Sequence, residues 1–477
     1  MIPRRVSVVG FDNIALGSFV TTGLTTVTLP LHPMNVAAGE TTLRLLAGVE
    51  QPPENLVPPE THRPRVVCRV PNTGGQDACR RTRRGGRHAT EGLRHSSEHW
   101  RQTMNTATRP KEFPIPKTMK AWVLDDPERL RLVEKPIPTP GPAEVLVRID
   151  AVAICGTDVE VITKGLPAWI EGGLPFNKNY TPGHEYMGTV VKLGPGVDEF
   201  TIGDRIAVEI HAGCGRCERC RMGMYTSCLN YGLNYGDKNK GHRANGFTTD
   251  GGFAEYAVNH INTLVHVPDE MSDEEATLIV TAGTAMYGLD ALGGLVAGES
   301  LVVTGPGPIG LMAVAVGKAL GAQPVILTGT RKSRLDLGAK LGADYTINVR
   351  DENAVEVVRR ITKGKGVHYV MECSGSPDAM NEAMDMVNRG GRICLAAFPS
   401  EPALVDLAKI VRNNIYLYGI RGEGKSATHR AAALMAQKRF NAKLIHTHTF
   451  PLEELPKAFK YFRERIEDAI KVVIKVH

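Results

Sequence analysis

Four closely spaced cysteines are the residues whose type and spacing most clearly predict a metal site. They occur in the run GCGRCERCRMGMYTSC with the spacing C-x2-C-x2-C-x7-C and are Cys214, Cys217, Cys220 and Cys228. Four thiolates at this spacing can surround one tetrahedral Zn²⁺ ion at about 2.3 Å. Because four protein ligands leave no open coordination position, this site is expected to stabilise a loop and to do no chemistry. Clustered free thiols and an iron–sulfur cluster are the alternatives.

A glycine-rich turn predicts a dinucleotide site. The run LVVTGPGPIG places Gly305, Gly307 and Gly310 as G-x-G-x-x-G between an apolar strand and a helix, with Pro308 and Ile309 inside the turn. Glycines at these positions permit a tight turn and close approach of the backbone to a pyrophosphate. The N-terminus of the following helix offers unpaired N–H groups to the phosphates.

The end of the next strand bears on which nicotinamide coenzyme binds. Sites that prefer NAD place an acidic residue there, about 20 residues further on, and its carboxylate binds the ribose 2′-hydroxyl. Gly329 occupies that position here, followed by Thr330, Arg331 and Lys332. A 2′-phosphate would meet a hydroxyl and two cations, so NADP is favoured over NAD. The alternative is that Arg331 and Lys332 only begin a solvated helix and that NAD, or either coenzyme, is used.

These motifs together resemble the zinc-containing medium-chain alcohol dehydrogenases. The resemblance extends from about Met119 to the C-terminus, and the cysteine spacing is similar to that of the lobe in which this family holds a structural zinc. The run from Gly183 to Val197 matches the family's zinc signature, G-H-E-x2-G-x5-G-x2-V, without a mismatch. The resemblance therefore implies a catalytic zinc as well, and two zinc ions per chain.

The resemblance also implies which residues hold the catalytic zinc. Cys155, in ICGTDVE, and His184 stand in two of the family's ligand contexts. A catalytic zinc needs about three protein ligands and one open position. Thr281 aligns with a further family ligand, but a neutral hydroxyl replaces a thiolate or carboxylate poorly. Similarity to glucose- and threonine-dehydrogenase-like members implies Glu185 as the third ligand, with water as the fourth.

Three residues that follow Cys155 take roles by the same resemblance. Asp158 is implied to hydrogen-bond a zinc-bound imidazole, a contact that fixes its tautomer. Thr157 resembles the hydroxyl that accepts the substrate proton. Glu160 stands where related enzymes have a histidine that passes this proton outward, and a solvated surface glutamate is the alternative. The implied reaction is zinc-assisted hydride transfer between a secondary alcohol (a polyol, sugar or threonine-like compound) and NADP or NAD.

The hydrophobic pattern predicts the elements that position these residues. Residues 119–280 alternate apolar and polar positions between glycine and proline turns, which indicates a β-rich catalytic domain. The resemblance implies that this domain is GroES-like and completed by residues 422–477. Residues 281–421 alternate strands with helices, as in LVVTG, IGLMAVAVGKALGA and VILTG, which predicts a Rossmann-type, doubly wound parallel sheet for coenzyme binding. The expected fold class is α/β.

The first 118 residues have a different composition. Within residues 1–70, the run RVSVVGFDNIALGSF resembles the carboxy-terminal end of the sugar-sensing domain of LacI-type repressors, so a short α/β fragment fused from such a regulator is expected. Residues 71–118 are rich in Arg, Gly and Ser with few aliphatic side chains, and they are expected to form a disordered linker. A basic nucleic-acid-binding tail is the alternative for this segment.

Charge and hydropathy limit the classes of partner. The net charge is +6, but the arginine excess lies between Arg63 and Arg109, so the folded part is not expected to bind nucleic acid. No stretch approaches the ~20 apolar residues that cross a bilayer, and no signal peptide is evident, so a cytoplasmic protein without membrane contact is expected. The resemblance favours a homo-oligomer, a tetramer or a dimer. The alternative functions are a zinc-free quinone or enoyl reductase of the same fold and a sugar-responsive transcriptional regulator.

Overall fold

The computed structural model describes residues 112–165, 180–230, 243–399 and 401–477. The chain divides into two compact units, residues 1–107 and 108–477, and all that follows belongs to the second. The expected sensor-like fragment, and the expected linker up to residue 111, lie outside the described residues. Within the described ranges, no helix has both the length and the apolar character needed to cross a membrane.

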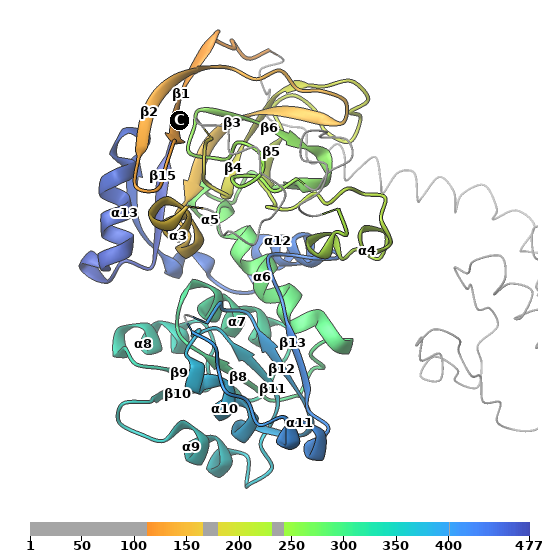
Figure 1. The fold of residues 1–477 in the computed structure, drawn as a ribbon, viewed down its shortest axis with the longest axis vertical. Coiled ribbons are helices and arrows are strands. Elements are labelled where there is room, and N and C mark those ends of the chain that lie inside the picture. Colours follow the sequence, from red (N-terminus) through yellow and green to blue (C-terminus); the bar gives the residue numbers. More distant parts are fainter. Residues whose placement is uncertain (1–111, 166–179, 231–242, 400) are drawn as a thin grey trace, which may run out of the picture. The chain divides into compact units, whose positions relative to one another are not determined.

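The catalytic half is built on a mixed sheet (Figure 1). Its strands follow the order β14-β15-β3-β4-β5-β7, with β6 also paired to β3. In chain order they are β3 (Glu144–Ala153), β4 (Glu185–Leu193), β5 (Arg205–Val208), β6 (Tyr256–His260), β7 (Leu264–His266), β14 (His446–Pro451) and β15 (Lys471–Lys475). The hairpin of β1 (Thr118–Leu124) and β2 (Leu130–Pro136) forms a separate antiparallel pair.

Strand β3 is the centre of this half because almost all of its residues are buried. It pairs with β4 along most of its length, and β15 joins its far end, where Val473 lies opposite Ala153. Strand β15, close to the C-terminus, thus belongs to the same sheet as β3. Position 188 in β4 requires glycine because of packing, since a Cβ there would lie 2.1 Å from the carbonyl oxygen of Arg148 in β3.

The coenzyme half is a sheet of parallel strands in the order β10-β9-β8-β11-β12-β13. The strands are β8 (Leu301–Thr304), β9 (Val325–Gly329), β10 (Tyr345–Asn348), β11 (Val367–Glu372), β12 (Val387–Leu395) and β13 (Tyr416–Gly419). The connecting helices are α7 (Pro308–Ala319), α8 (Lys332–Lys340), α9 (Ala354–Ile361), α10 (Pro377–Met386) and α11 (Leu407–Asn413). The predicted doubly wound parallel sheet is confirmed.

Helices cover both faces of this parallel sheet. Leu301 and Val303 of β8 pack into one apolar cluster with Val314 of α7, whereas Val302 packs into another with Val358 of α9. Alternate residues of a strand point to opposite faces, so one short apolar strand can contribute to two cores. Strand order reverses at β8, between β9 and β11, and ligands bind outside the carboxyl ends of the strands at such a point.

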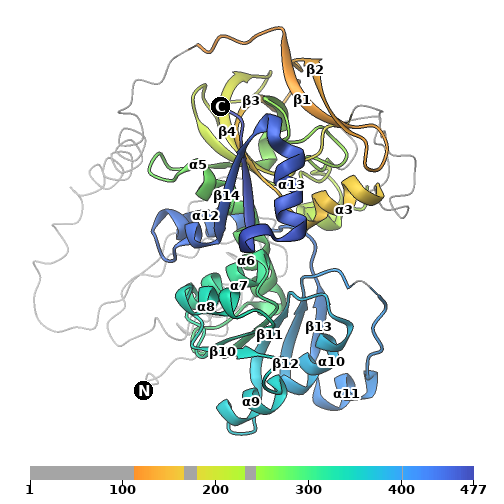
Figure 2. The ribbon, with the colours of Figure 1, turned by 90° about the vertical axis from the view of Figure 1, so that its left-hand side faces the viewer.

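Helix α6 (Ile279–Asp290) lies in the apolar cluster that both halves share, with α7 on one side and α12 (Ala427–Ala436) on the other (Figure 2). Small residues permit this close packing. A Cβ on Gly283 would lie 3.1 Å from the Cα of Thr428, and one on Gly288 would lie 2.7 Å from Cε of Met371. The helix is therefore held firmly, and its side chains have fixed positions.

The remaining helices of the catalytic half are short and carry or flank the candidate site residues. They are α3 (Gly156–Lys164), α4 (Glu218–Arg221), α5 (Asp273–Ala276) and α13 (Leu455–Glu464), together with the 3-10 turn η2 (Tyr225–Ser227). Cys155 directly precedes α3, and Cys217 directly precedes α4. Two cysteines thus stand at the amino ends of helical turns, where backbone N–H groups are unpaired.

Candidate metal and coenzyme sites

A buried carboxylate organises the first site. Cys155 is the residue before helix α3, and Asp158 lies in the first turn of that helix. Oδ2 of Asp158 accepts a hydrogen bond from the backbone N–H of Cys155 at 2.9 Å, while its Oδ1 lies 2.9 Å from Nδ1 of His184. Asp158 is 1% exposed, so solvent does not compete for either bond. One side chain thereby fixes both a thiol and an imidazole.

His184 stands directly before β4 and is itself buried. The Asp158 carboxylate accepts from Nδ1–H, so Nε2 is the ring nitrogen left for a metal ion. Burial lowers the pKa of His184, but the charges of Asp158 and Cys155 raise it well above its ordinary value. An imidazole with this hydrogen bond is an electron-rich ligand, and a partner of this kind strengthens metal binding.

Ligand atoms of Cys155, His184 and Glu185 all lie within 4.8 Å of one another. A thiolate, an imidazole nitrogen and a carboxylate oxygen form a set that zinc accepts, with room for one more ligand. Oε1 of Glu185 also accepts from the Thr281 hydroxyl at 3.3 Å. Cys155, His184 and Glu185 are called the metal group below. Thr281 therefore lies beside the metal group and contacts it through Glu185.

Lys471 is a member of this site that the sequence interpretation missed. It begins β15, is 1% exposed, and its ammonium donates to Oε2 of Glu185. Burial lowers the pKa of Lys471, but Glu185 and Cys155 raise it above its ordinary value, so it stays charged. A carboxylate has about four lone-pair positions, enough for Lys471, Thr281 and a metal ion together. The available signal was a lysine at the start of an otherwise apolar strand, KVVIK.

Thr157 and Glu160, the two residues expected to carry the substrate proton, differ in their distance from the metal group. The Cys155 thiol donates to the Thr157 hydroxyl over 3.8 Å, so half-buried Thr157 lies within the metal site. Glu160 is exposed on α3 and pairs with Lys164 one turn later at 3.6 Å. No hydrogen bond or ion pair within the described ranges joins Glu160 to the metal group.

The cysteine cluster forms the second site. The sulfur atoms of Cys214, Cys217, Cys220 and Cys228 all lie within 4.8 Å of one another, and those of Cys214 and Cys220 are 4.0 Å apart. A tetrahedron of sulfurs at 2.3 Å from zinc has edges of about 3.8 Å. The N–H groups of Cys217 and Cys220 donate to sulfur at 3.4 Å, and the Asn230 amide donates to Cys214 at 3.2 Å. Burial raises the pKa of Cys214, but hydrogen bonds from the Arg216 backbone, the Asn230 amide and the Cys217 backbone lower it to about 6, so Cys214 fits a zinc ligand.

Each of the three glycines in the coenzyme turn is required for a different structural reason. Gly305 has φ +85°, and a Cβ there would lie 2.7 Å from Cα of Ser374. A Cβ on Gly310 would lie 2.0 Å from the carbonyl oxygen of Gly305. Gly307 precedes α7, whose first residue is Pro308, and nothing lies within 4 Å of its Cβ position. The open side of Gly307 fits a phosphate that approaches the backbone.

Glu372, at the end of β11, holds the neighbouring loop against this turn. Its carboxylate accepts from the Thr304 hydroxyl at 3.2 Å and from the N–H groups of Ser374 and Gly375 at 2.6 and 3.1 Å. Because Ser374 touches Gly305, this buried carboxylate helps to shape the pyrophosphate side of the turn. No motif marked Glu372, although a glutamate ending an apolar strand at a sheet's carboxyl edge was the available signal.

At the end of β9, close packing leaves no space for a side chain at position 329. It is buried, and a Cβ there would lie 2.5 Å from Cδ of Pro306 in the glycine turn. Thr330 and Lys332 are exposed, Arg331 is half-buried, and Lys332 pairs with Asp336 on its own helix at 2.7 Å. Arg331 is therefore better placed than Lys332 to face a ligand at this sheet edge.

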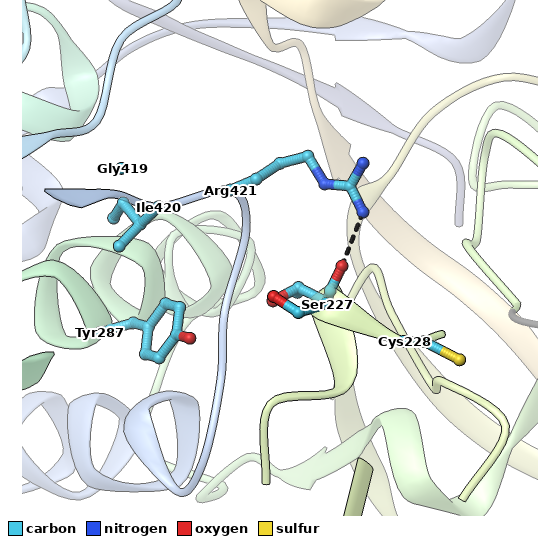
Figure 3. A pocket seen from close by; sticks show the side chains of 7 residues that line it. Ser227, Cys228, Tyr287, Gly419, Ile420 and Arg421 are labelled. Atoms are coloured by element: carbon cyan, nitrogen blue, oxygen red, sulfur yellow. Dashed lines mark hydrogen bonds between the residues drawn. The ribbon is translucent and has the colours of Figure 1, made fainter. Parts of the chain in front are cut away.

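A cavity of about 460 Å³ opens beyond β13 (Figure 3). Three segments line it: the turn that leads to Cys228, helix α6 through Tyr287, and residues 419–421. Arg421 donates to the carbonyl oxygen of Thr226 at 2.8 Å and so ties two of these walls together. The cavity is at the carboxyl end of a coenzyme-half strand, where bound ligands are expected.

Two buried acids lie near this cavity. Glu209, which follows β5, is 3% exposed and accepts from the Tyr225 hydroxyl at 3.0 and 3.1 Å. Glu423 is 0% exposed and accepts from the Thr284 hydroxyl at 3.3 Å. Burial raises the pKa of Glu209 to about 7, and burial together with the Glu209 charge raises that of Glu423 to about 8. No sequence motif pointed to either residue.

A glycine turn at a sheet's switch point and a buried Cys–His–Glu group fit the class of metal- and nucleotide-dependent dehydrogenases, and comparison with known proteins agrees. Residues 141–269 match the alcohol dehydrogenase GroES-like domain, and residues 308–437 match the zinc-binding dehydrogenase domain. The chain belongs to the zinc-containing medium-chain alcohol dehydrogenase family. Residues 1–66 match the periplasmic binding protein-like domain, which supports the resemblance seen there.

Individual relatives cover nearly their whole length. The L-threonine 3-dehydrogenase of Pyrococcus furiosus is 36% identical over 335 residues, which are 70% of this chain and 91% of the relative. The sorbitol dehydrogenase of Bacillus subtilis is 31% identical over 361 residues, 76% of this chain and 98% of the relative. The solved alcohol dehydrogenase of Thermus sp. ATN1 has a TM-score of 0.65 at 29% identity, with 75% of this chain and 100% of that chain covered. The chain is accordingly an oxidoreductase of small-molecule alcohols.

The glycine turn gives a first test. We expect Gly310→Ala to destabilise the fold by about 1–3 kcal/mol, because its Cβ would overlap the Gly305 carbonyl oxygen. Gly307→Ala is the matched control, since its Cβ meets open space and should leave the unfolding midpoint unchanged while weakening NAD(P)H binding. Denaturant unfolding and fluorescence titration with coenzyme measure the two effects. Equal midpoints for both variants would contradict the packing argument.

The buried acids give a second test. The pKa of Glu423 is raised from 4.5 to about 8 by burial and by Glu209, with His184 lowering it and Glu185 raising it further. Its stabilising effect is full below about pH 4.5 and is lost as the pH rises towards 8, because the unfolded chain releases its proton first. Glu423→Gln should therefore be more stable than wild type at about pH 8, by a few kcal/mol at most, and no more stable at about pH 5. Denaturant unfolding of both proteins at the two pH values measures this, and equal differences would refute it.

Proposed function

We propose that the chain transfers a hydride between a secondary alcohol and a nicotinamide coenzyme at a zinc ion held by Cys155, His184 and Glu185. The observation that carries this proposal is the convergence of three ligand types within 4.8 Å. The buried bonds of Asp158 to Cys155 and His184 add to it. The named relatives act on threonine or sorbitol, which supports a polyol, sugar or threonine-like substrate.

Each side chain then has a defined task. A zinc ion bound there would act as a Lewis acid that lowers the pKa of the substrate hydroxyl, and the nicotinamide would carry the hydride. Asp158 keeps Nε2 of His184 directed at the metal, and Lys471 compensates the charge of Glu185. Thr157, beside Cys155, would accept the hydroxyl proton of the substrate and pass its own hydroxyl proton on to water. Exposed Glu160 would hand protons to solvent only through intervening water.

The cysteine cluster is proposed to hold a second, structural zinc. All four coordination positions would be filled by sulfur, so no substrate atom could reach the metal. The N–H and amide donors to Cys214 and Cys217 stabilise the thiolate form that a metal requires. Such reduced thiols suit a reducing compartment, and we propose the cytoplasm.

We propose NADP as the preferred coenzyme, with NAD as the alternative. Support comes from the absence of a carboxylate at the end of β9 in the described chain, where Gly329 has no room for any side chain. Half-buried Arg331 stands at the start of α8, where a guanidinium can bind a 2′-phosphate through two hydrogen bonds.

We also propose a homo-oligomer, a dimer or tetramer. Strand β13 forms an open edge of the coenzyme sheet in the described chain, and its Tyr416 is 55% exposed. Beside it, Leu404, Leu407 and Val411 are 91%, 69% and 75% exposed. Large exposed apolar side chains close together along the chain are a reason to expect a contact surface, and a two-fold axis would pair the edge with its own copy.

Metal analysis tests the catalytic site. Cys155→Ala should reduce the zinc content from about two ions per chain to about one and abolish turnover, because two protein ligands hold zinc poorly. Binding of the coenzyme, measured by fluorescence titration, should persist. Cys217→Ser should also lose an ion, but it should lower the unfolding midpoint more than the turnover per folded molecule. Turnover by Cys155→Ala protein, or a wild type holding less than about one zinc, would favour a zinc-free reductase instead.

The coenzyme proposal has its own pair of variants. Arg331→Ala should raise the Kd for NADPH about tenfold, which corresponds to a loss of roughly 1.4 kcal/mol for one charged contact. The Kd for NADH should stay within about twofold of its wild-type value. Lys332→Ala is the control, since Lys332 is exposed and already paired with Asp336. If both variants weaken NADPH and NADH alike, Arg331 does not read the 2′-phosphate.

A further inference from the structure

Glu423 has a carboxyl oxygen whose bonding is incomplete. Its Oε1 accepts from Thr284, but its Oε2 is buried and has no hydrogen-bond partner among the described residues. Leaving a buried polar atom without a partner costs about 1–3 kcal/mol, and folded proteins do so rarely. Glu209 differs, because both of its oxygens accept from Tyr225. Glu423 therefore offers an acceptor that the described protein leaves free.

Helix α6 places this acceptor between the metal group and the cavity. Thr281, Thr284 and Tyr287 follow at intervals of three residues and so lie side by side on one helix face. Thr281 donates to Glu185 of the metal group, and Thr284 donates to Glu423. Tyr287 lines the cavity. Thr281 and Thr284 are about one helical turn apart, and Glu423 is close enough to His184 and Glu185 for their charges to act on it.

The segment that carries Glu423 is pressed against the same cavity. Arg421, two residues earlier, lines it, and a Cβ on Gly424 would lie 2.5 Å from the ring of Tyr287. A Cβ on Gly422 would lie 2.9 Å from the ring of His211. Such contacts leave the backbone of this segment little freedom, so the Glu423 carboxyl group has a fixed place behind the residues that line the cavity.

Charge decides what such an acceptor can receive. None of the ion pairs within the described ranges includes Glu209 or Glu423, so the two acids lie close together without a bound cation. Above about pH 8, where Glu423 is ionised, a substrate carboxylate next to the two acids would meet like charge in a buried setting, which opposes its binding. A hydroxyl or ammonium group would instead supply the donor that Oε2 lacks.

We propose that Glu423 binds the substrate at the carbon next to the one oxidised, by accepting a hydrogen bond from a hydroxyl or ammonium group there. The substrate is then a vicinal diol, such as a polyol, or an amino alcohol, and it bears no carboxylate at that carbon. This inference rests on the proposed function and narrows it, since it separates the chain from dehydrogenases that act on threonine itself.

Four alcohols with the same reacting end test this on the zinc-loaded full chain. Butan-2-ol has no group on the next carbon, butane-2,3-diol has a hydroxyl, 3-aminobutan-2-ol has an ammonium group, and L-threonine has both an ammonium group and a carboxylate. We expect kcat/KM for the diol or the amino alcohol to exceed that for butan-2-ol at least about tenfold, because a site built around a donor rejects an analogue without it. L-Threonine should fall below whichever of the two is better.

Variants assign the preference to Glu423. Glu423→Leu, similar in size but without an acceptor, should reduce the diol-to-butan-2-ol ratio about tenfold. Glu209→Gln, which changes the satisfied acid of the pair, should leave this ratio within about twofold. Calorimetric binding of butane-2,3-diol to the enzyme–coenzyme complex should weaken in the first variant only. If Glu423→Leu does not fold, Glu423→Ala with the same ratio measurement replaces it.

The outcomes separate this inference from the proposed function. L-Threonine as the best of the four, or an unchanged ratio in Glu423→Leu, overturns the role of Glu423 while the dehydrogenase itself stands. No oxidation of any alcohol by a chain that holds zinc and binds coenzyme overturns the proposed function. A preference for 3-aminobutan-2-ol over the diol identifies ammonium as the group bound, and the reverse identifies hydroxyl.

Discussion

The carboxylate of Asp158 is the constraint on which the metal site depends. It accepts from the backbone of Cys155 and from the ring of His184, and thereby joins the start of α3 to the start of β4. A charged, buried acceptor with two donors is stable only while both remain, since losing either leaves unpaired charge in a dry setting. The geometry of the thiol and the imidazole is therefore set before any metal arrives. Pre-organisation of this kind is what a catalytic metal needs to keep one position open.

Helix α6 connects the metal group (Cys155, His184 and Glu185) to Glu423 and to the cavity. Its Thr281 and Thr284 donate to two different buried acids, Glu185 and Glu423, while its opposite faces pack against α7 and α12. A helix fixed on several sides transmits its position rigidly to each side chain. The metal group, the free carboxyl oxygen and the cavity wall thus keep constant spacing, which selects substrates by the separation of their polar groups.

The sequence predicts those parts of the fold and of the candidate site whose residues lie close together along the chain. The parallel sheet, the glycine turn and the cysteine cluster follow from short motifs, because each needs residues close together along the chain. The role of Asp158 follows from the family resemblance of the run around Cys155 and not from spacing alone. Lys471 and Glu423 are not predicted, since they reach the site from the far end of the chain. No spacing rule links position 185 to 471, and only the pairing of β15 with β3 brings them together. The choice of coenzyme falls between these cases: Gly329 is visible in the sequence as a missing acid, but its contact with Pro306 is not.

The structural cluster and the substrate cavity are less separate than their chemistry implies. Cys228 lines the cavity, Arg421 binds the carbonyl oxygen of Thr226 just before it, and the N–H of Lys425 donates to the carbonyl oxygen of Gly223 at 2.8 Å. The cysteine lobe is therefore bonded on both sides of Glu423. A metal bound by the four cysteines would restrict the segment that carries Glu423, although no substrate atom would touch that metal. The cluster would then contribute to specificity through the position of this backbone, and loss of the metal would make the distance between Glu423 and the metal group less well defined.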